Sequence, residues 1–357
     1  MIQKSIVFIL PDLEMGGAER IVTTLANNLP REKFRPSIML MRKQGHYLTL
    51  LKEDVEVIDL KVERIRQSLL PILKTLRKIK PDIVFCGYGE VNAYLSLFTK
   101  LFPKTKFVAR ETNVVSEHVK RPEIKFFYRF YNNFDRIICQ SDDMQNDLLK
   151  HFNLKSSKMV KINNPVDFEF ITQQLAEQDK PNEYKDDVKN VVAVGNLSAR
   201  KGFDNLLKVF THLKQDNIHL HILGDGADKE LLNNLKNEFG LDKVTFHGKK
   251  SNPYPYLKFA DLFILSSRYE GFPNVLLEAG ACGTYALAND CPGGIQEIVQ
   301  PGKNGVIGII ENESEFAEQI RTTLSENHNA DEVRKSIHDR FSKEIILQKY
   351  IEVLENL

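Results

Sequence analysis

Short apolar runs alternate with helix-like segments along almost the whole chain, and this alternation restricts the fold more than any other sequence feature. Many of the runs are continuous, as in strands that a parallel sheet buries on both faces. The expected strands are 5–10, 37–41, 55–60, 83–86, 106–109, 136–139, 191–194, 219–223, 244–246, 262–265, 285–288 and 306–310. Between them, segments such as 18–29 and 203–213 carry apolar residues at helical spacing. The pattern predicts doubly wound α/β sheets.

The length of the chain and one polar interruption predict two domains. A chain of 357 residues with 42% hydrophobic and 27% charged residues can bury two cores. The interruption is at 178–189, where Tyr184 and Val188 are the apolar residues. We predict an N-terminal domain at 1–168, a linker at 169–189, a C-terminal domain at 190–340 and a helical segment at 341–357. The apolar stripe of that last helix is expected at Ile345, Ile346, Tyr350, Ile351 and Leu354.

Charge, cysteine spacing and hydropathy exclude several classes of protein. The net charge of +1 provides no global field for nucleic acid, so we expect no nucleic-acid partner. The cysteines, Cys86, Cys139, Cys282 and Cys291, are too widely spaced for a zinc site. The first apolar run is too short for a signal peptide, and no stretch approaches the ~20 apolar residues that span a bilayer. We therefore expect a cytoplasmic protein, which can still touch a membrane surface.

The stretch from Ser267 to Ala279 is the strongest candidate for a ligand-binding loop. It lies between the strand 262–265 and a helix expected at 275–282. In parallel sheets, ligands bind beyond the carboxyl ends of the strands, and the amides at a helix N-terminus suit phosphate. Glu270 and Glu278 are expected at the start of this loop and in the first helical turn. Taken singly, each acid is more typical of a structural residue than of a ligand contact: Glu270 of a loop cap and Glu278 of a solvated first-turn acid.

The whole string Glu-Gly-Phe-Pro-Asn-Val-Leu-Leu-Glu-Ala resembles the signature of the family-4 glycosyltransferases, which are retaining nucleotide-sugar enzymes with the GT-B fold. The resemblance implies two Rossmann-like domains that face a central cleft, with the last helix crossing back to the N-terminal domain. It implies that Glu278 binds the donor ribose hydroxyls. It places Glu270 and the backbone of Phe272, Pro273, Asn274 and Val275 against the donor sugar and diphosphate.

Two further motifs extend the resemblance. Gly16-Gly17-Ala18-Glu19-Arg20 follows the first strand without the G-x-G-x-x-G spacing of a dinucleotide site. It is similar to the N-terminal motif of the family, in which small residues let the backbone approach the diphosphate. Glu19 and Arg20 are then structural or face the acceptor.

The second motif supplies positive charge. The resemblance implies that Lys201 and Arg200 neutralise the departing nucleoside diphosphate. Asn196 stands where many relatives have an arginine, and Arg200 can supply that charge. With these cations available we expect no metal and no cofactor. The pair Asp142-Asp143 follows Ser141 ahead of a helix, as capping residues do.

Loops on either side of this region complete the expected donor site. Gly224 and Asp225 follow one buried strand, and His247 follows the next. The resemblance implies that these loops border the nucleotide base, although each is equally typical of an ordinary turn. The segment Pro292–Glu297 again matches the family and is expected to close the donor site.

The acceptor side departs from the family pattern. Many relatives carry a histidine after the fifth strand, where this chain has Thr112. Arg110 and Glu111, with the more distant His118, are therefore the candidates for the acceptor pocket.

A basic, aromatic segment follows. The residues that make up its expected membrane contact are Lys120, Arg121, Lys125, Phe126, Phe127 and Arg129. Aromatic residues at this spacing are also typical of a core. Interleaved with cations, they favour contact with anionic lipid headgroups.

The resemblance and these features together predict a retaining glycosyltransferase that moves a hexose or N-acetylhexosamine from a nucleoside diphosphate to a saccharide acceptor. UDP is the expected nucleotide. The expected acceptor is a lipid-linked glycan of bacterial surface polysaccharide synthesis, such as capsule or lipopolysaccharide. The expected location is peripheral, on the inner face of the cell membrane. The alternatives are a GT-B nucleotide-sugar epimerase, which needs no acceptor, and a non-catalytic two-domain ligand-binding protein, which would require export.

Overall fold

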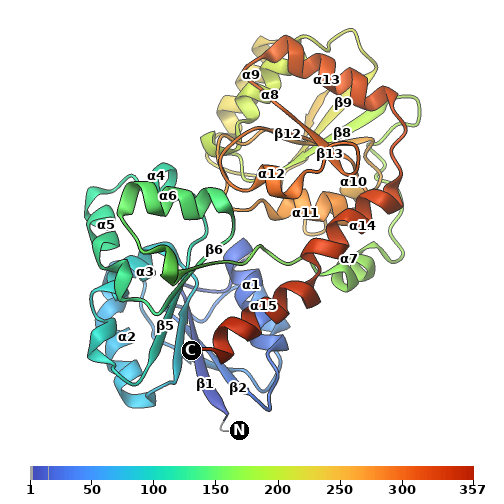
Figure 1. The fold of residues 1–357 in the computed structure, drawn as a ribbon. Coiled ribbons are helices and arrows are strands. Elements are labelled where there is room, and N and C mark those ends of the chain that lie inside the picture. The colour runs from blue at the N-terminus through green and yellow to red at the C-terminus, as the bar shows by residue number, and fades with distance from the viewer. Residues whose placement is uncertain (1–2, 15) are drawn as a thin grey trace. The chain divides into compact units, whose positions relative to one another are not determined.

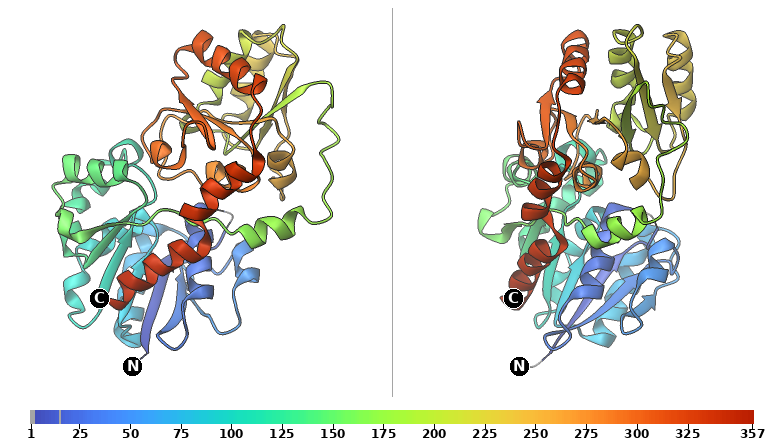
Figure 2. Two further views of the ribbon diagram at one scale, coloured as in Figure 1. Left: turned by 45° about the vertical axis from the view of Figure 1, so that its right-hand side comes forward. Right: turned by 90° about the vertical axis from the view of Figure 1, so that its right-hand side faces the viewer.

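The computed structural model describes residues 3–14 and 16–357, which divide into two compact units (Figure 1). The first unit comprises Met1–Pro165 together with Glu344–Leu357, and the second is the continuous segment Val166–Lys343. Each unit is built on one parallel sheet, and Figure 2 shows helices on both faces of each sheet. The predicted α/β fold class, with two Rossmann-like sheets, is confirmed.

The sheet of the first unit has seven parallel strands in the order β3-β2-β1-β4-β5-β6-β7. Their bounds are β1 Lys4–Leu10, β2 Phe34–Leu40, β3 Glu56–Asp59, β4 Ile83–Cys86, β5 Lys106–Arg110, β6 Arg136–Cys139 and β7 Met159–Lys161. The strand β1 pairs with β2 on one side and with the central strand β4 on the other. All four residues of β4 are buried, which explains its continuous apolar sequence.

Helices cover both faces of this sheet. They are α1 Gly17–Asn28, α2 Ile65–Ile79, α3 Gly89–Ser96, α4 Val115–His118, α5 Pro122–Phe127, α6 Asp142–Phe152 and α15 Lys343–Glu355, with the 3-10 turns η1 His46–Leu50, η2 Thr99–Leu101, η3 Tyr128–Asn133 and η4 Ser156–Lys158. The side chain of Ser141 caps α6 by accepting a hydrogen bond from the Met144 amide. Asp142 and Asp143 lie in the first turn of that helix, and Asp142 pairs with Lys161 at 2.7 Å.

The last helix, α15, completes the core of the first unit. Tyr350 is fully buried, and its hydroxyl accepts a hydrogen bond of 3.1 Å from the Arg110 guanidinium. Ile346 and Leu354 join the same core. Ile345 was expected on this buried stripe but is exposed, because the face that packs contains its neighbour Ile346 instead.

The second unit has a six-stranded parallel sheet in the order β10-β9-β8-β11-β12-β13. Its strands are β8 Lys189–Val194, β9 Ile218–Leu223, β10 Val244–Phe246, β11 Leu262–Leu265, β12 Ala286–Asn289 and β13 Gly305–Gly308. Its helices are α7 Phe168–Leu175, α8 Phe203–Thr211, α9 Lys229–Glu238, α10 Tyr254–Lys258, α11 Asn274–Ala281, α12 Ile295–Ile298, α13 Glu313–Ser325 and α14 Ala330–Phe341, and η5 is Ala199–Lys201.

The polar segment after α7 is anchored to the second unit. Tyr184 is buried, and its hydroxyl donates to the Tyr256 carbonyl at 2.9 Å. The region expected as a linker at 169–189 thus contains most of α7 and a segment that packs on the second sheet. Two aromatic residues anchor this region, because Phe170 packs edge-on against Tyr254 and Tyr184 is buried.

Residues 3–14 and 16–357 contain neither a membrane-spanning helix nor a cluster of metal-binding side chains. No helix there is long and apolar enough to cross a bilayer. No group of three or more His, Cys, Asp or Glu side chains there is arranged to hold a metal ion.

Candidate active site

The strand order of the second sheet reverses between β8 and β11. From β8 the chain proceeds to β9 on one side, and from β11 it proceeds to β12 on the other. In open α/β sheets such a switch point separates the two following loops and leaves a crevice at the carboxyl ends of the strands. The loops at this point are 195–202 after β8 and 266–273 after β11.

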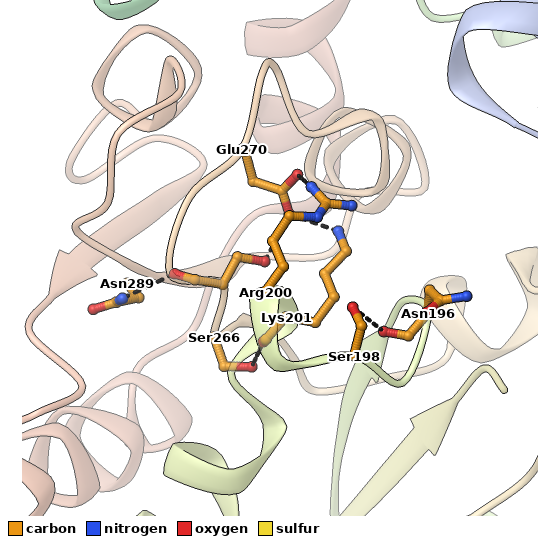
Figure 3. A network of polar contacts seen from close by, with 8 residues as sticks. Asn196, Ser198, Arg200, Lys201, Ser266, Glu270 and Asn289 are labelled. Carbon is orange, nitrogen blue, oxygen red and sulfur yellow. Dashed lines mark hydrogen bonds and ion pairs between the residues drawn. The ribbon is translucent and has the colours of Figure 1, made fainter. Parts of the chain in front are cut away.

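Glu270 is the centre of a polar cluster at this switch point (Figure 3). One carboxylate oxygen accepts hydrogen bonds from Lys201 Nζ at 2.5 Å and Ser267 Oγ at 2.6 Å, and the other accepts from Arg200 at 2.6 Å. Glu270 is only 4% exposed. Burial by itself would raise the pKa of Glu270, but the charges of Lys201 and Arg200 hold that pKa below its ordinary value.

Backbone contacts join the two loops that carry this cluster. The Ser266 hydroxyl donates to the Lys201 carbonyl at 2.8 Å, and the Arg268 amide donates to the Arg200 carbonyl at 2.8 Å. Gly202 follows Lys201 with φ +64°, and a Cβ there would lie 2.1 Å from the Ser266 carbonyl oxygen. Glycine is therefore required where the loops meet.

Two residues to which the sequence analysis gave no role hold the cluster in place. The Ser267 hydroxyl donates to the Glu270 carboxylate, and Asn289 at the end of β12 donates to the Ser267 carbonyl at 3.0 Å. Asn289 is itself fixed, because its side-chain oxygen accepts from the Ile310 amide. The Glu270 amide donates to the Pro292 carbonyl at 2.8 Å, so the Pro292–Glu297 segment also supports the loop.

The helix α11 begins at Asn274, immediately after Pro273. Glu278 is thus its fifth residue and not a first-turn acid as expected, and it is 9% exposed rather than solvated. Phe272 is buried and its ring packs against Phe341 at 5.5 Å, so only the backbone of Phe272 is available to a ligand. The first amides of an α-helix have no partners within the helix, and here they follow the Glu270 loop directly.

The neighbouring loops after β8, β9 and β10 are joined by backbone hydrogen bonds. Leu197 N donates to the Asp225 carbonyl, and Gly224 N donates to the Gly248 carbonyl, each at 2.9 Å. Asn196 and Asp225 are exposed at these ends. A Cβ on Gly224, whose φ is +146°, would overlap the Gly195 carbonyl oxygen at 1.8 Å.

His247 is oriented differently from the expectation. Its side chain is turned inward, where Nε2 lies 2.9 Å from Nδ1 of His221 and the two rings stack. Burial lowers the pKa of His247, and it lowers the pKa of His221 to about 3. The His247 side chain therefore belongs to the interior, and only the backbone of this loop is available to a base.

The glycine pair of the first unit is at the start of α1. Gly16 is the N-cap, and a Cβ on it would come within 2.1 Å of the Glu19 carboxylate, which reaches back over the helix end. Burial, with a smaller contribution from Asp12, raises the pKa of Glu19. Glu19 thus has a structural role at the helix end where Gly16 and Gly17 lie.

Arg110 and Glu111 are not the surface residues that an acceptor contact requires. They are 1% and 3% exposed. Arg110 donates to Tyr350 and to Asn164, and Glu111 accepts from the hydroxyls of Tyr131 at 2.7 Å and Tyr128 at 3.2 Å. Burial raises the pKa of Glu111.

Both side chains were expected in the acceptor pocket because they lie beside Thr112, where many relatives carry a histidine, but residues of α15 and η3 cover this end of β5. His118, the third candidate, is exposed at the end of α4.

Comparisons with known proteins identify the family. Residues 175–340 match the family described as Glycosyl transferases group 1, and residues 15–170 match Glycosyltransferase Family 4. Over 355 residues, 95% of this chain and 93% of its relative, the chain is 30% identical to the N-acetylgalactosamine-N,N'-diacetylbacillosaminyl-diphospho-undecaprenol 4-alpha-N-acetylgalactosaminyltransferase of Campylobacter jejuni. The chain belongs to the family-4 glycosyltransferases.

Solved structures share the fold of this glycosyltransferase. A glycosyltransferase from Rickettsia africae superposes with a TM-score of 0.82 over 99% of this chain and 98% of its own, at 18% identity. HepE of Anabaena, solved in complex with UDP and glucose, gives a TM-score of 0.81 over 99% of this chain and 100% of its own, at 20% identity. These neighbours confirm the GT-B fold.

The basic, aromatic segment of the glycosyltransferase divides into two parts. Tyr128 and Tyr131 are fully buried, and Phe127 is half-buried against Tyr94. Phe126 is 50% exposed, with the Arg129 guanidinium 5.3 Å from its ring centroid.

The cations of the segment are exposed but differ in their contacts. Arg121 pairs with Glu90 at 2.5 Å, Lys120 lies 4.0 Å from Glu117, and the Arg129 guanidinium lies over the Phe126 ring. The surface part of the segment therefore comprises Lys120, Arg121, Lys125, Phe126 and Arg129, and its two tyrosines are core.

The Glu270 cluster makes the stability of this glycosyltransferase depend on pH. Because the folded-state pKa of Glu270 is below the ordinary value of 4.5, the cluster stabilises the fold above about pH 4.5 and loses that contribution as pH falls through the folded-state pKa. We expect the Tm difference between wild type and Glu270→Gln to be constant above about pH 5.5 and to shrink towards about pH 3. Thermal denaturation followed by circular dichroism checks this, and a difference that stays constant down to pH 3 would contradict it.

Proposed function

We propose that this glycosyltransferase is a retaining enzyme that transfers a hexose or N-acetylhexosamine from UDP to a lipid-linked glycan. The carrying observation is the placement of two cations, Lys201 and Arg200, beside a buried carboxylate at the switch point of the second sheet. UDP is supported by HepE, whose structure contains UDP and glucose. A lipid-linked acceptor is supported by the Campylobacter jejuni relative, whose name specifies a diphospho-undecaprenol substrate.

The chemistry follows from the charges of the site. Breaking the bond between sugar and diphosphate leaves negative charge on the departing phosphate oxygen. Lys201, Arg200 and the first amides of α11 stabilise that charge, so the transfer needs no divalent metal. Glu270 accepts hydrogen bonds from donor-sugar hydroxyls, and Glu278 accepts those of the ribose. The loops after β9 and β10 border the base through their backbone atoms.

A lipid-linked acceptor places the reaction at a membrane. We propose that the enzyme works peripherally on the inner face of the cell membrane, in the synthesis of a bacterial surface polysaccharide. Lys125 and Arg129 offer positive charge to lipid phosphates, and the exposed ring of Phe126 can enter the headgroup boundary.

Incubation with UDP-sugars, with and without a lipid-linked glycan, tests the proposal. We expect UDP release that depends on the glycan, and an α-linked product from an α-linked donor, as retention requires. Free sugar or an isomerised sugar formed equally well without acceptor would identify an epimerase. Binding of a UDP-sugar with no turnover under any acceptor would identify a ligand-binding protein.

Glu278→Ala should lose donor binding while the fold survives. The loss of charged hydrogen bonds to ribose should weaken UDP binding by about 1.5–3 kcal/mol, measured by titration calorimetry. Glu318→Ala, which removes an acid on α13 of the same unit that pairs with Arg321 at 3.0 Å, is the control and should bind UDP normally. Unchanged UDP affinity in Glu278→Ala would remove Glu278 from the donor site.

Transfer should persist in excess chelator, because Lys201, Arg200 and the helix amides hold the diphosphate. Lys201→Ala should reduce kcat by about 10²-fold or more if this lysine stabilises the leaving group. Steady-state rates of UDP release measure both effects. Activity that chelator abolishes and magnesium or manganese restores would show that a metal performs this role.

The glycosyltransferase should sediment with anionic liposomes, and raising the salt concentration should weaken that binding. Each cation near an anionic surface contributes about 1 kcal/mol, so Lys125→Ser with Arg129→Ser should reduce sedimentation strongly. The matched control is Lys208→Ser with Lys214→Ser, which removes two exposed cations from the second unit. If both double variants bind as the wild type does, the segment is not a membrane contact and the acceptor need not be lipid-linked.

A further inference from the structure

The cations that the diphosphate requires are already engaged within the protein. Lys201 and Arg200 both donate to Glu270, and each is accepted by a different oxygen of its carboxylate (Figure 3). One negative charge thus offsets one of the two positive charges. Attraction between charges is strong where water is largely excluded, and these groups are partly or wholly buried.

We propose that Glu270 competes with the donor diphosphate for Lys201 and Arg200, and that this competition makes the enzyme bind an intact UDP-sugar in preference to UDP. This inference rests on the proposed function, because it takes UDP-sugar as the donor. It assigns to Glu270 a part in releasing the spent nucleotide, in addition to contact with the sugar.

The carboxylate is held more firmly than the cations. Ser267 fixes its side chain, and the Glu270 amide is bonded to the Pro292 carbonyl. Gly293 packs so closely that a Cβ on it would lie 2.4 Å from the Glu270 carbonyl oxygen. Lys201 ends a flexible four-carbon chain that passes over Gly195, where a Cβ would meet its Cε at 3.2 Å. An arriving phosphate therefore draws the cations away from a carboxylate that stays in place.

A carboxylate that loses these partners needs others. Burial prevents water from solvating it fully, and Ser267 satisfies only one of its acceptor sites. Sugar hydroxyls are hydrogen-bond donors and can take the places that the cations leave. UDP brings the diphosphate without those hydroxyls, so it draws the cations from Glu270 and gives the carboxylate no new hydrogen-bond donors. The intact UDP-sugar draws the cations away and also supplies hydroxyls that bond to Glu270.

Glu270→Gln separates these effects, because it removes the charge and keeps the shape. Titration calorimetry with UDP, uridine and UDP-N-acetylgalactosamine should show UDP binding at least about fivefold tighter than in the wild type. Uridine, which has no phosphate, should bind the two proteins equally. The affinity ratio of UDP-sugar to UDP should fall, and kcat should fall because product leaves slowly and the sugar contact is lost.

Two further variants keep the result interpretable. Glu270→Asp retains the charge but shortens the reach to both cations, so UDP should bind with intermediate affinity even if the glutamine variant folds poorly. Asp216→Asn removes a carboxylate that pairs with Arg321 in the same unit at 3.0 Å, and it should leave UDP affinity unchanged.

The outcomes separate this inference from the proposed function. If the wild type binds no UDP and no UDP-sugar, the proposed function is wrong. If the wild type binds UDP but Glu270→Gln and Glu270→Asp bind it equally or more weakly, Glu270 positions the cations instead of competing for them. That result would overturn the inference and leave the glycosyltransferase assignment intact.

Discussion

The ion cluster of Glu270 with Lys201 and Arg200 is the interaction on which the rest of the site depends. A buried carboxylate without partners would cost several kcal/mol, and the two cations that reach it from the loop after β8 offset much of that cost. The same contacts bring together the loops that leave neighbouring strands in opposite directions. The cations that we propose bind the donor diphosphate are therefore the same cations that join these two loops.

Uncharged residues fix the position of the Glu270 carboxylate. Asn289 transmits the position of β12 to Ser267, and Ser267 in turn fixes Glu270. Glycines at 202, 224 and 293 let three backbone segments approach more closely than any side chain would allow. The parallel sheet brings all these loops to one edge, because every strand of the second unit ends there.

Much of this could be predicted from the sequence, for reasons that differ by residue. The strands at 83–86, 136–139, 244–246 and 262–265 were predicted with their observed bounds. For 83–86 and 262–265 the reason is plain, because a strand buried on both faces is a continuous apolar run. The edge strand β7, Met159–Lys161, has no buried residue and gave no such signal. Lys201, Arg200 and Glu270 were found through a motif, whereas Ser267 and Asn289 carry no charge that would single them out.

Long-range packing set the limit of prediction. Arg110 and Glu111 follow a strand, as ligand-binding residues do, and nothing local indicates that Tyr350, 240 residues away, covers Arg110. His247 follows a strand as well, but its orientation depends on His221 in the neighbouring strand. Each error concerns the direction of a side chain whose partner lies far along the chain.

The placement of α15 has a consequence for how the protein is made. The second unit is one uninterrupted segment, Val166–Lys343, while the first unit needs segments from both sides of it. On the ribosome, β1 emerges before the second unit is made, and Tyr350 is synthesised only after it. The second unit is thus complete while the first still lacks its final helix, which reverses the usual N-terminal-first order of domain folding during synthesis. A chain that stopped before Tyr350 would carry a finished second unit and an unfinished first one.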